Sequence, residues 1–168
     1  MKIIVFSDSH GCTDNMCSVM KRNFSDTDLV IHLGDGSEDC AEVMADYPQI
    51  PLVLISGNRE EYLHLFLSSP LMIEDVFTVA GKKIVAGHGH KYHVKSGDTG
   101  AISHALSLDA DILLYGHTHE AVCKTFVSDD TGHELYILNP GTVGATAQPT
   151  YGMLLLSDDG IKAEIKSV

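Results

Sequence analysis

The chain has 168 residues, of which 44% are hydrophobic and 20% charged, and its net charge is −12 at pH 7. These values predict one globular domain over residues 1–168. The acidic balance argues against a nucleic-acid polymer as partner, because its binding needs clustered lysine and arginine. No stretch approaches the ~20 apolar residues of a membrane span, and the first apolar run is too short for a signal peptide. Four cysteines without a CxxC pair are typical of a reduced protein, so we expect a cytoplasmic location and no membrane partner.

Short apolar runs alternate with helical stretches in the first half of the chain. We expect strands at 3–6, 29–33 and 52–55, a helix that is capped by Thr13 or Asp14 and runs to about residue 23, and a second helix from 37 to about 46. Ser37 is the expected N-terminal cap of the second helix. Strands and helices that alternate in this way predict a mostly parallel sheet.

The second half contains more strands and fewer helices. The expected strands are 72–79, 83–86, 111–115, 121–127, 134–138, 151–156 and 161–166, with a helix at 99–108. Short turns separate 72–79 from 83–86, 121–127 from 134–138, and 151–156 from 161–166. Each of these pairs is predicted to form an antiparallel hairpin. We expect a turn over residues 139–142, a packed core histidine at His32, and helical positions for His64 and His104.

Five of the apolar runs end in turns that carry side chains able to bind a metal. Asp8 and His10 follow the first strand, two residues apart, so an extended backbone would project them to the same side. The full set, in chain order, is Asp8, His10, Asp35, Asn58, His88, His117 and His119. Taken singly, Asp8 could cap a helix, and Asp35 and Asn58 could belong to ordinary turns. Because the ends of parallel strands meet at one sheet edge, we expect the seven side chains to converge.

Imidazole nitrogen and carboxylate oxygen together indicate which ions would suit this edge. The mixture favours Mn²⁺, Fe²⁺, Zn²⁺, Co²⁺ or Ni²⁺ over Mg²⁺ and Ca²⁺, which prefer shells made only of oxygen. The number of donors fits two ions, which in two-metal hydrolases lie about 3.5–4 Å apart.

The order of these motifs resembles that of the calcineurin-like metallophosphoesterases. The motifs are Asp-x-His, Gly-Asp, Gly-Asn-x-[Asp/Glu], Gly-His and Gly-His-x-His, and together they span residues 4 to about 144. The short length, the run from His88 to Tyr92 and the late Asn139-Pro140-Gly141 look most like the small, capless bacterial and archaeal phosphodiesterases of that family. The resemblance implies an α/β fold of two packed mixed β-sheets flanked by helices.

The resemblance also implies a scheme of metal ligands. One ion would be held by Asp8, His10 and His119, the other by Asn58, His88 and His117, and Asp35 would bridge the two. We expect two divalent ions, Mn²⁺ first, with Zn²⁺, Fe²⁺, Ni²⁺ or Co²⁺ as alternatives. In the implied chemistry, a hydroxide between the ions attacks phosphorus in line with the leaving oxygen.

Arg59 departs from much of the family. Larger relatives have a histidine here that is commonly assigned to protonate the leaving group, and arginine stays protonated, so it cannot be that acid. Arg59 either clamps a phosphate oxygen or pairs with Glu60, Glu61 or Asp14. We expect His90 to orient neighbouring ligands.

The late motif departs from the family as well. Thr142 stands where the family often has serine, and residues 145–150 contain no lysine or arginine.

The sequence thus predicts a metal-dependent phosphodiesterase that acts on a small phosphoester, with a monoester as the alternative substrate and self-association left open. A non-catalytic scaffold that uses the same fold to bind proteins is a second hypothesis. A nuclease is a third, and the acidic charge argues against it.

Overall fold

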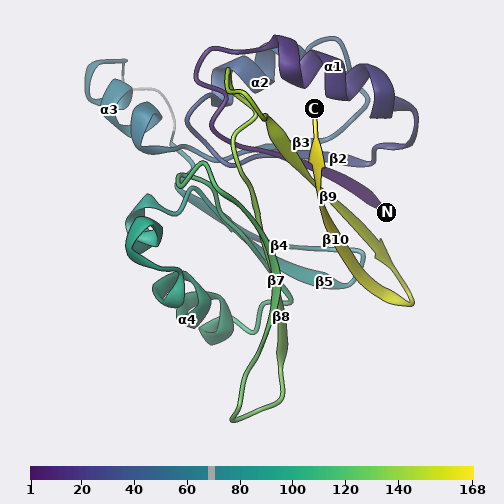
Figure 1. Cartoon of the computed structure of the whole chain (residues 1–168), viewed down its shortest axis with the longest axis vertical. Helices are drawn as coiled ribbons and strands as arrows, with labels where there is room; N and C mark the ends of the chain where they lie inside the picture. Colours follow the sequence, from purple (N-terminus) through teal and green to yellow (C-terminus); the bar gives the residue numbers. More distant parts are fainter. Residues whose placement is uncertain (68–70) are drawn as a thin grey trace.

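The structure, a computed structural model, describes residues 1–67 and 71–168 (Figure 1). Within these residues, ten strands form two five-stranded sheets, and four α-helices accompany them. The strands are β1 Lys2–Phe6, β2 Leu29–His32, β3 Leu52–Leu54, β4 Glu74–Val79, β5 Lys82–Gly87, β6 Ile112–Leu114, β7 Ala121–Val127, β8 Glu134–Pro140, β9 Thr150–Ser157 and β10 Gly160–Ser167. The α-helices are α1 Asp14–Asn23, α2 Ser37–Met44, α3 Asn58–Leu67 and α4 Thr99–Ser107, and short 3₁₀ turns cover Phe24–Asp26, His90–Tyr92 and Val94–Ser96.

The first sheet has the strand order β10-β9-β1-β2-β3. Strands β1, β2 and β3 are parallel, as the alternation of strands and helices predicts. The final hairpin, β9 and β10, joins this sheet from the far end of the chain, with Met153 opposite Ile4 in antiparallel register. β1 is therefore the central strand and is buried on both faces.

The second sheet has the order β4-β5-β6-β8-β7. Its three central strands, β5, β6 and β8, are parallel, whereas β4 and β7 pair antiparallel at the two edges. Both sheets are therefore mixed, and the fold class predicted from the sequence is confirmed.

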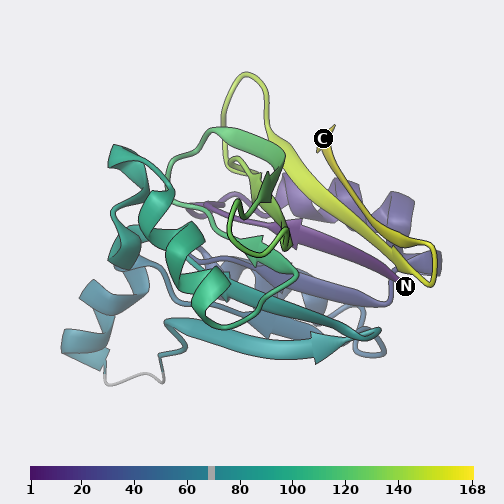
Figure 2. The same cartoon turned by 90° about the horizontal axis from the view of Figure 1, so that it is seen from below.

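The side chains of β1 show how the layers are held together. Ile3 and Val5 point into the core between the two sheets, and Ile4 and Phe6 point outward against α1 and α2. On the outer face of the second sheet, Val85 and its neighbours pack against α4. Figure 1 shows α1 and α2 at the top and α4 at the lower left, and the view from below (Figure 2) places α4 on the opposite side from α1. Each fully buried aliphatic side chain of this kind stabilises the fold by about 1.5–3 kcal/mol.

Two sequence-based expectations about local structure are wrong. Ser37 does not cap α2, because the helix begins at Ser37 itself, and the Ser37 hydroxyl donates to the carbonyl of Ile55 at 2.6 Å. Asn139 and Pro140 are not part of a turn but the last residues of β8, where they pair with β7. None of the helices in the described part of the chain is long and apolar enough to cross a membrane.

Candidate metal centre

The residues predicted to bind metal lie in the loops that follow β1, β2, β3, β5 and β6. Backbone hydrogen bonds join these loops within each sheet, from Asp8 N to Gly34 O at 3.0 Å and from Gly116 N to His88 O at 3.0 Å. Across the two sheets, the ring nitrogen Nδ1 of His88 donates to the carbonyl of Leu33 at 2.7 Å. The strand ends of both sheets therefore form one continuous edge.

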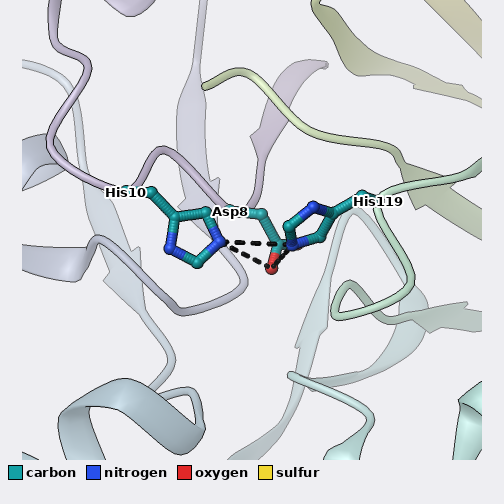
Figure 3. A group of neighbouring side chains, drawn as sticks. All are labelled: Asp8, His10 and His119. Atoms are coloured by element: carbon teal, nitrogen blue, oxygen red, sulfur yellow. Dashed lines mark hydrogen bonds and ion pairs between the residues drawn. The ribbon is translucent and has the colours of Figure 1, made fainter. Parts of the chain in front are cut away.

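Asp8, His10 and His119 form the first triad (Figure 3). The Nε2 atoms of His10 and His119 are 3.2 Å apart, and they lie 3.9 and 3.2 Å from Oδ1 of Asp8, respectively. Both imidazole rings therefore direct a nitrogen at the same carboxylate oxygen. Three metal-ligating atoms at this spacing can surround one ion.

The two oxygens of Asp8 differ in their partners. Oδ2 accepts hydrogen bonds from the Ser7 hydroxyl at 2.5 Å and from the backbone N–H of His117 at 3.0 Å. Oδ1 is buried and accepts no hydrogen bond, because the nearby imidazole nitrogens are not aligned to donate one. An unsatisfied buried acceptor is costly, and a cation that binds at Oδ1 would remove that cost. The first triad thus fits a metal ion.

Asp35, His88 and His117 form the second triad. His88 Nε2 is 3.6 Å from Asp35 Oδ1 and 3.1 Å from His117 Nδ1. Because Nδ1 of His88 donates to a carbonyl, its Nε2 carries the lone pair that a metal needs. Burial, and after it the charge of the nearby His88, lowers the pKa of His117 to about 4, so His117 is neutral and able to ligate at neutral pH.

The two triads are directly connected. The backbone N–H of His117, from the second triad, is one of the donors to Asp8, from the first. Asn58 is the exposed first residue of α3, and the backbone N–H of the next residue, Arg59, donates to Asp35 Oδ1 at 2.8 Å. Asn58 therefore begins a helix whose first turn is attached to Asp35.

Glu60 is an important residue of the site whose role the sequence motif did not reveal. Its carboxylate accepts four backbone hydrogen bonds, with lengths of 2.7–3.1 Å, from Asp35, Gly36, Ser37 and Gly57. Burial alone would raise the pKa of Glu60, but these four amides hold it below its usual value. The side chain thus binds the loop after β2 to the start of α3. The Gly-Asn-x-Glu motif marks this position, but only the folded loops bring the four amides together.

Five of the predicted ligands have left-handed backbone conformations. Their φ angles lie between 49° and 70°, and the residues are Asp8, His10, Asp35, His117 and His119. A positive φ is uncommon outside glycine, and such residues cluster at functional sites. The expectation that an extended backbone brings Asp8 and His10 to one side is therefore wrong. Tight left-handed turns direct them to the same point instead.

His32 is the packed core histidine that the sequence predicts. It is fully buried, accepts a hydrogen bond from Gly34 N–H at Nδ1, and lies 3.4 Å from the Ser9 hydroxyl through Nε2. Burial lowers the pKa of His32 to about 4, so the ring is neutral near pH 7. The ring supports the loops that carry Asp8 and Asp35 without belonging to either triad.

Arg59 and His90 border the second triad. The exposed guanidinium of Arg59 makes no ion pair with any residue in 1–67 or 71–168, so the pairing with Glu60, Glu61 or Asp14 does not occur. The ring centroid of His90 is 5.3 Å from that of His88 and 6.0 Å from that of His117. His90 Nε2 is 3.3 Å from Glu61 Oε2, but the two atoms are not aligned for a hydrogen bond.

The end of β8 and the segment after it fix the loops that carry Asp8, His117 and His119. The buried amide of Asn139 donates to Gly116 O at 3.1 Å and to the Thr118 hydroxyl at 2.9 Å, next to His117 and His119. The hydroxyl of Thr142 donates to the carbonyl of Asp8 at 2.7 Å. Threonine at this position thus provides the hydroxyl that serine has in much of the family.

Comparison with known proteins identifies what this arrangement resembles. The calcineurin-like phosphoesterase superfamily domain matches residues 1–159. A probable metallophosphoesterase of Bacillus subtilis, YsnB, is 26% identical over 163 residues, covering 95% of this chain and 86% of its own length.

Two solved structures share the fold. An archaeal phosphodiesterase superposes with a TM-score of 0.64 at 24% identity, covering 99% of this chain and 100% of its own. The zinc complex of Vps29 from Entamoeba histolytica superposes with a TM-score of 0.70 at 18% identity, covering 99% of each chain.

Proposed function

The chain belongs to the calcineurin-like phosphoesterase superfamily, and on this basis we propose that it hydrolyses a small phosphodiester with the help of two divalent metal ions. The observation that carries the proposal is the pair of facing triads, one of which includes a buried carboxylate oxygen without a hydrogen-bond donor. A phosphoester that binds here would meet a compact group of metal ligands at the edge of both sheets.

The proposed ligand scheme assigns one ion to each triad. Asp8, His10 and His119 hold the first, His88 and His117 hold the second together with Asn58, and Asp35 bridges them. When bound, the two ions would neutralise phosphate charge and lower the pKa of water so that hydroxide is available near neutral pH. We propose Mn²⁺ as the native ion, with Zn²⁺, Fe²⁺, Ni²⁺ and Co²⁺ as alternatives, because the donors mix imidazole and carboxylate.

The residues around the ligands have positioning roles in this proposal. His88 keeps its Nε2 lone pair available because its Nδ1 donates to Leu33 O, and Glu60 holds the Asp35 loop against α3. Arg59 has a guanidinium that is free of ion pairs within the described residues, and we assign it to a phosphate oxygen of the substrate. His90 packs beside His88 and His117 and limits how far their rings can turn.

A scaffold function is the competing hypothesis, because Vps29 shares the fold. That likeness, at 18% identity, concerns the fold alone, and the presence of all seven residues of the proposed ligand scheme supports hydrolysis. We propose that the protein acts in the cytoplasm, on the basis of its four free cysteines.

Activity measurements with defined metals test the proposed function. Protein depleted of metal should not hydrolyse bis-p-nitrophenyl phosphate, and Mn²⁺ or another of the proposed ions should restore turnover. Absence of turnover with every divalent ion would contradict the proposal. A protein that binds two ions and still hydrolyses no phosphoester in a broad panel would support the scaffold instead.

A further inference from the structure

A cavity of about 560 Å³ lies directly beside the first triad. This volume is within the range of small-molecule pockets. His119 belongs both to the triad and to the cavity wall, so the cavity opens next to the point where the phosphate is proposed to bind. The other lining residues are Ala121, Ala147, Gln148, Pro149, Thr150, Ser167 and Val168.

The side chains that line this cavity are uncharged apart from the titratable ring of His119. None of them is a lysine, arginine, aspartate or glutamate, and residues 145–150 contain no basic side chain. The second triad differs, because the cationic residue Arg59 is adjacent to it in the fold, where the Arg59 backbone N–H donates to Asp35 Oδ1. A charged group placed in the cavity would find no opposite charge among the lining side chains to compensate for lost hydration.

The wall of the cavity is attached to the metal centre by hydrogen bonds. Thr142 Oγ1 donates to Asp8 O, and the N–H of Thr150 donates to Thr142 O at 2.9 Å. The hydroxyl of Thr150 donates to Pro140 O at 2.7 Å, and the amide of Asn15 donates to the carbonyl of Val143 at 2.8 Å. The segment that carries Ala147 and Gln148 therefore has a defined position relative to Asp8.

We infer that this cavity binds an uncharged organic substituent of the phosphodiester, while the phosphate itself lies at the two triads. The inference rests on the proposed function and narrows its substrate class. Substrates with a ring or hydroxyl-bearing group and no second charge are preferred over those with a further phosphate or carboxylate. Ala147 is exposed and small, which leaves room for the substituent, and the Gln148 amide offers it a hydrogen-bond donor.

Calorimetric binding of phosphate compounds to the metal-loaded protein tests the inference without relying on turnover. Phenyl phosphate should bind at least about tenfold more tightly than inorganic phosphate, and 4-carboxyphenyl phosphate should lose most of that gain. Ala147→Trp, which fills the cavity, should abolish the advantage of phenyl phosphate and leave the binding of inorganic phosphate unchanged. Ala147→Lys should instead favour 4-carboxyphenyl phosphate, because it adds the missing cation.

Ala41→Trp is the matched control, since Ala41 is also exposed but lines a different cavity beside α2 and α3. It should change none of these affinities. Equal binding of phenyl phosphate and inorganic phosphate, unaffected by Ala147→Trp, would overturn the inference while hydrolysis by the wild type left the proposed function intact. If metal-loaded protein neither bound phosphate nor hydrolysed any phosphoester, the proposed function would fail, and this inference with it.

Discussion

Oδ1 of Asp8 and Nε2 of His119 lie 3.2 Å apart, although Asp8 follows a strand of the first sheet and His119 a strand of the second. Nε2 of His119 does not donate a hydrogen bond to Oδ1, and Oδ1 has no other donor. The pair therefore combines two properties that single substitutions can separate. It belongs to the proposed metal site, and it is also a local source of instability when no cation is bound.

Asp8→Asn should separate these properties. The asparagine amide can donate to the imidazole nitrogens while its oxygen keeps the contacts of Oδ2, so the melting temperature in the presence of EDTA should rise by a few degrees. Turnover should fall at least about 100-fold, because the anionic ligand is lost. Scanning calorimetry and kinetics measure the two effects, with the exposed Asp14→Asn as control. A variant with wild-type activity would show that Asp8 is not a metal ligand.

The two triads should lose their ions independently. Wild-type protein is expected to bind two ions per chain, and His119→Gln and His117→Gln should each retain one, which metal analysis after dialysis can count. Since each triad joins residues of both sheets, an ion at 100 times its dissociation constant should stabilise the wild type by about 2.7 kcal/mol per site. His133→Gln, at the far end of the second sheet, serves as control. Loss of both ions from either single variant would argue for one shared site.

Glu60→Gln should destabilise the metal-free protein by at least about 2 kcal/mol, because one of its two acceptor oxygens becomes an amide that cannot accept from backbone N–H groups. Urea denaturation in EDTA measures the change. Glu61→Gln is the matched control on the same helix, since Glu61 pairs with the half-exposed Lys91 and should cost less than about 1 kcal/mol. Equal effects of the two substitutions would rule out the loop-binding role of Glu60.

Arg59→Ala should raise KM about 10-fold or more and leave the folding free energy unchanged, because the guanidinium makes no ion pair in the described part of the chain. Steady-state kinetics with a diester and urea denaturation provide the two measurements. Arg22→Ala, an exposed arginine at the end of α1, controls for the loss of overall positive charge. Unchanged KM for Arg59→Ala would exclude a contact with substrate.

His32 should make the stability of the metal-free protein depend on pH. Its folded pKa of about 4 lies below the ordinary value of 6.5, so the unfolded chain binds the additional proton between these two values. The contribution of His32 to the free energy of unfolding should therefore be greatest above pH 6.5 and fall by up to about 3 kcal/mol as pH decreases toward 4, and His117 should add a second contribution of the same sign. His32→Gln should flatten this slope in denaturation series from pH 4 to 7. An unchanged slope would mean that other groups cause the dependence.

The sequence predicts the broad architecture because the signals involved are local. The apolar run of β1 needs burial on both faces, and its alternation places Ile3 inward and Ile4 outward. The polar ends of parallel strands meet at one edge of each sheet, which explains why Asp8 could be assigned beside Asp35 and His88 beside His117. The approach of Asp35 to His88 at 3.6 Å depends in addition on how the two sheets pack.

Features that depend on distant loops were not predictable in the same way. β9 pairs with β1 from the far end of the chain, and no local pattern encodes this pairing. The role of Glu60 depends on four amides from two loops, and the Ser37 hydroxyl donates to Ile55 O instead of capping α2. In each case, the contact that decides the local structure is made with a distant part of the chain.

The left-handed conformations of the five predicted ligands have a consequence for the evolution of this protein. Each such non-glycine residue costs about 1–3 kcal/mol, and glycine adopts the same dihedral angles without steric conflict. Replacement of Asp35 or His10 by glycine would thus relieve backbone strain at the same time as it removed a ligand. Selection for stability alone would erode these positions first, so under the proposed function it is selection for hydrolysis that keeps these side chains in place.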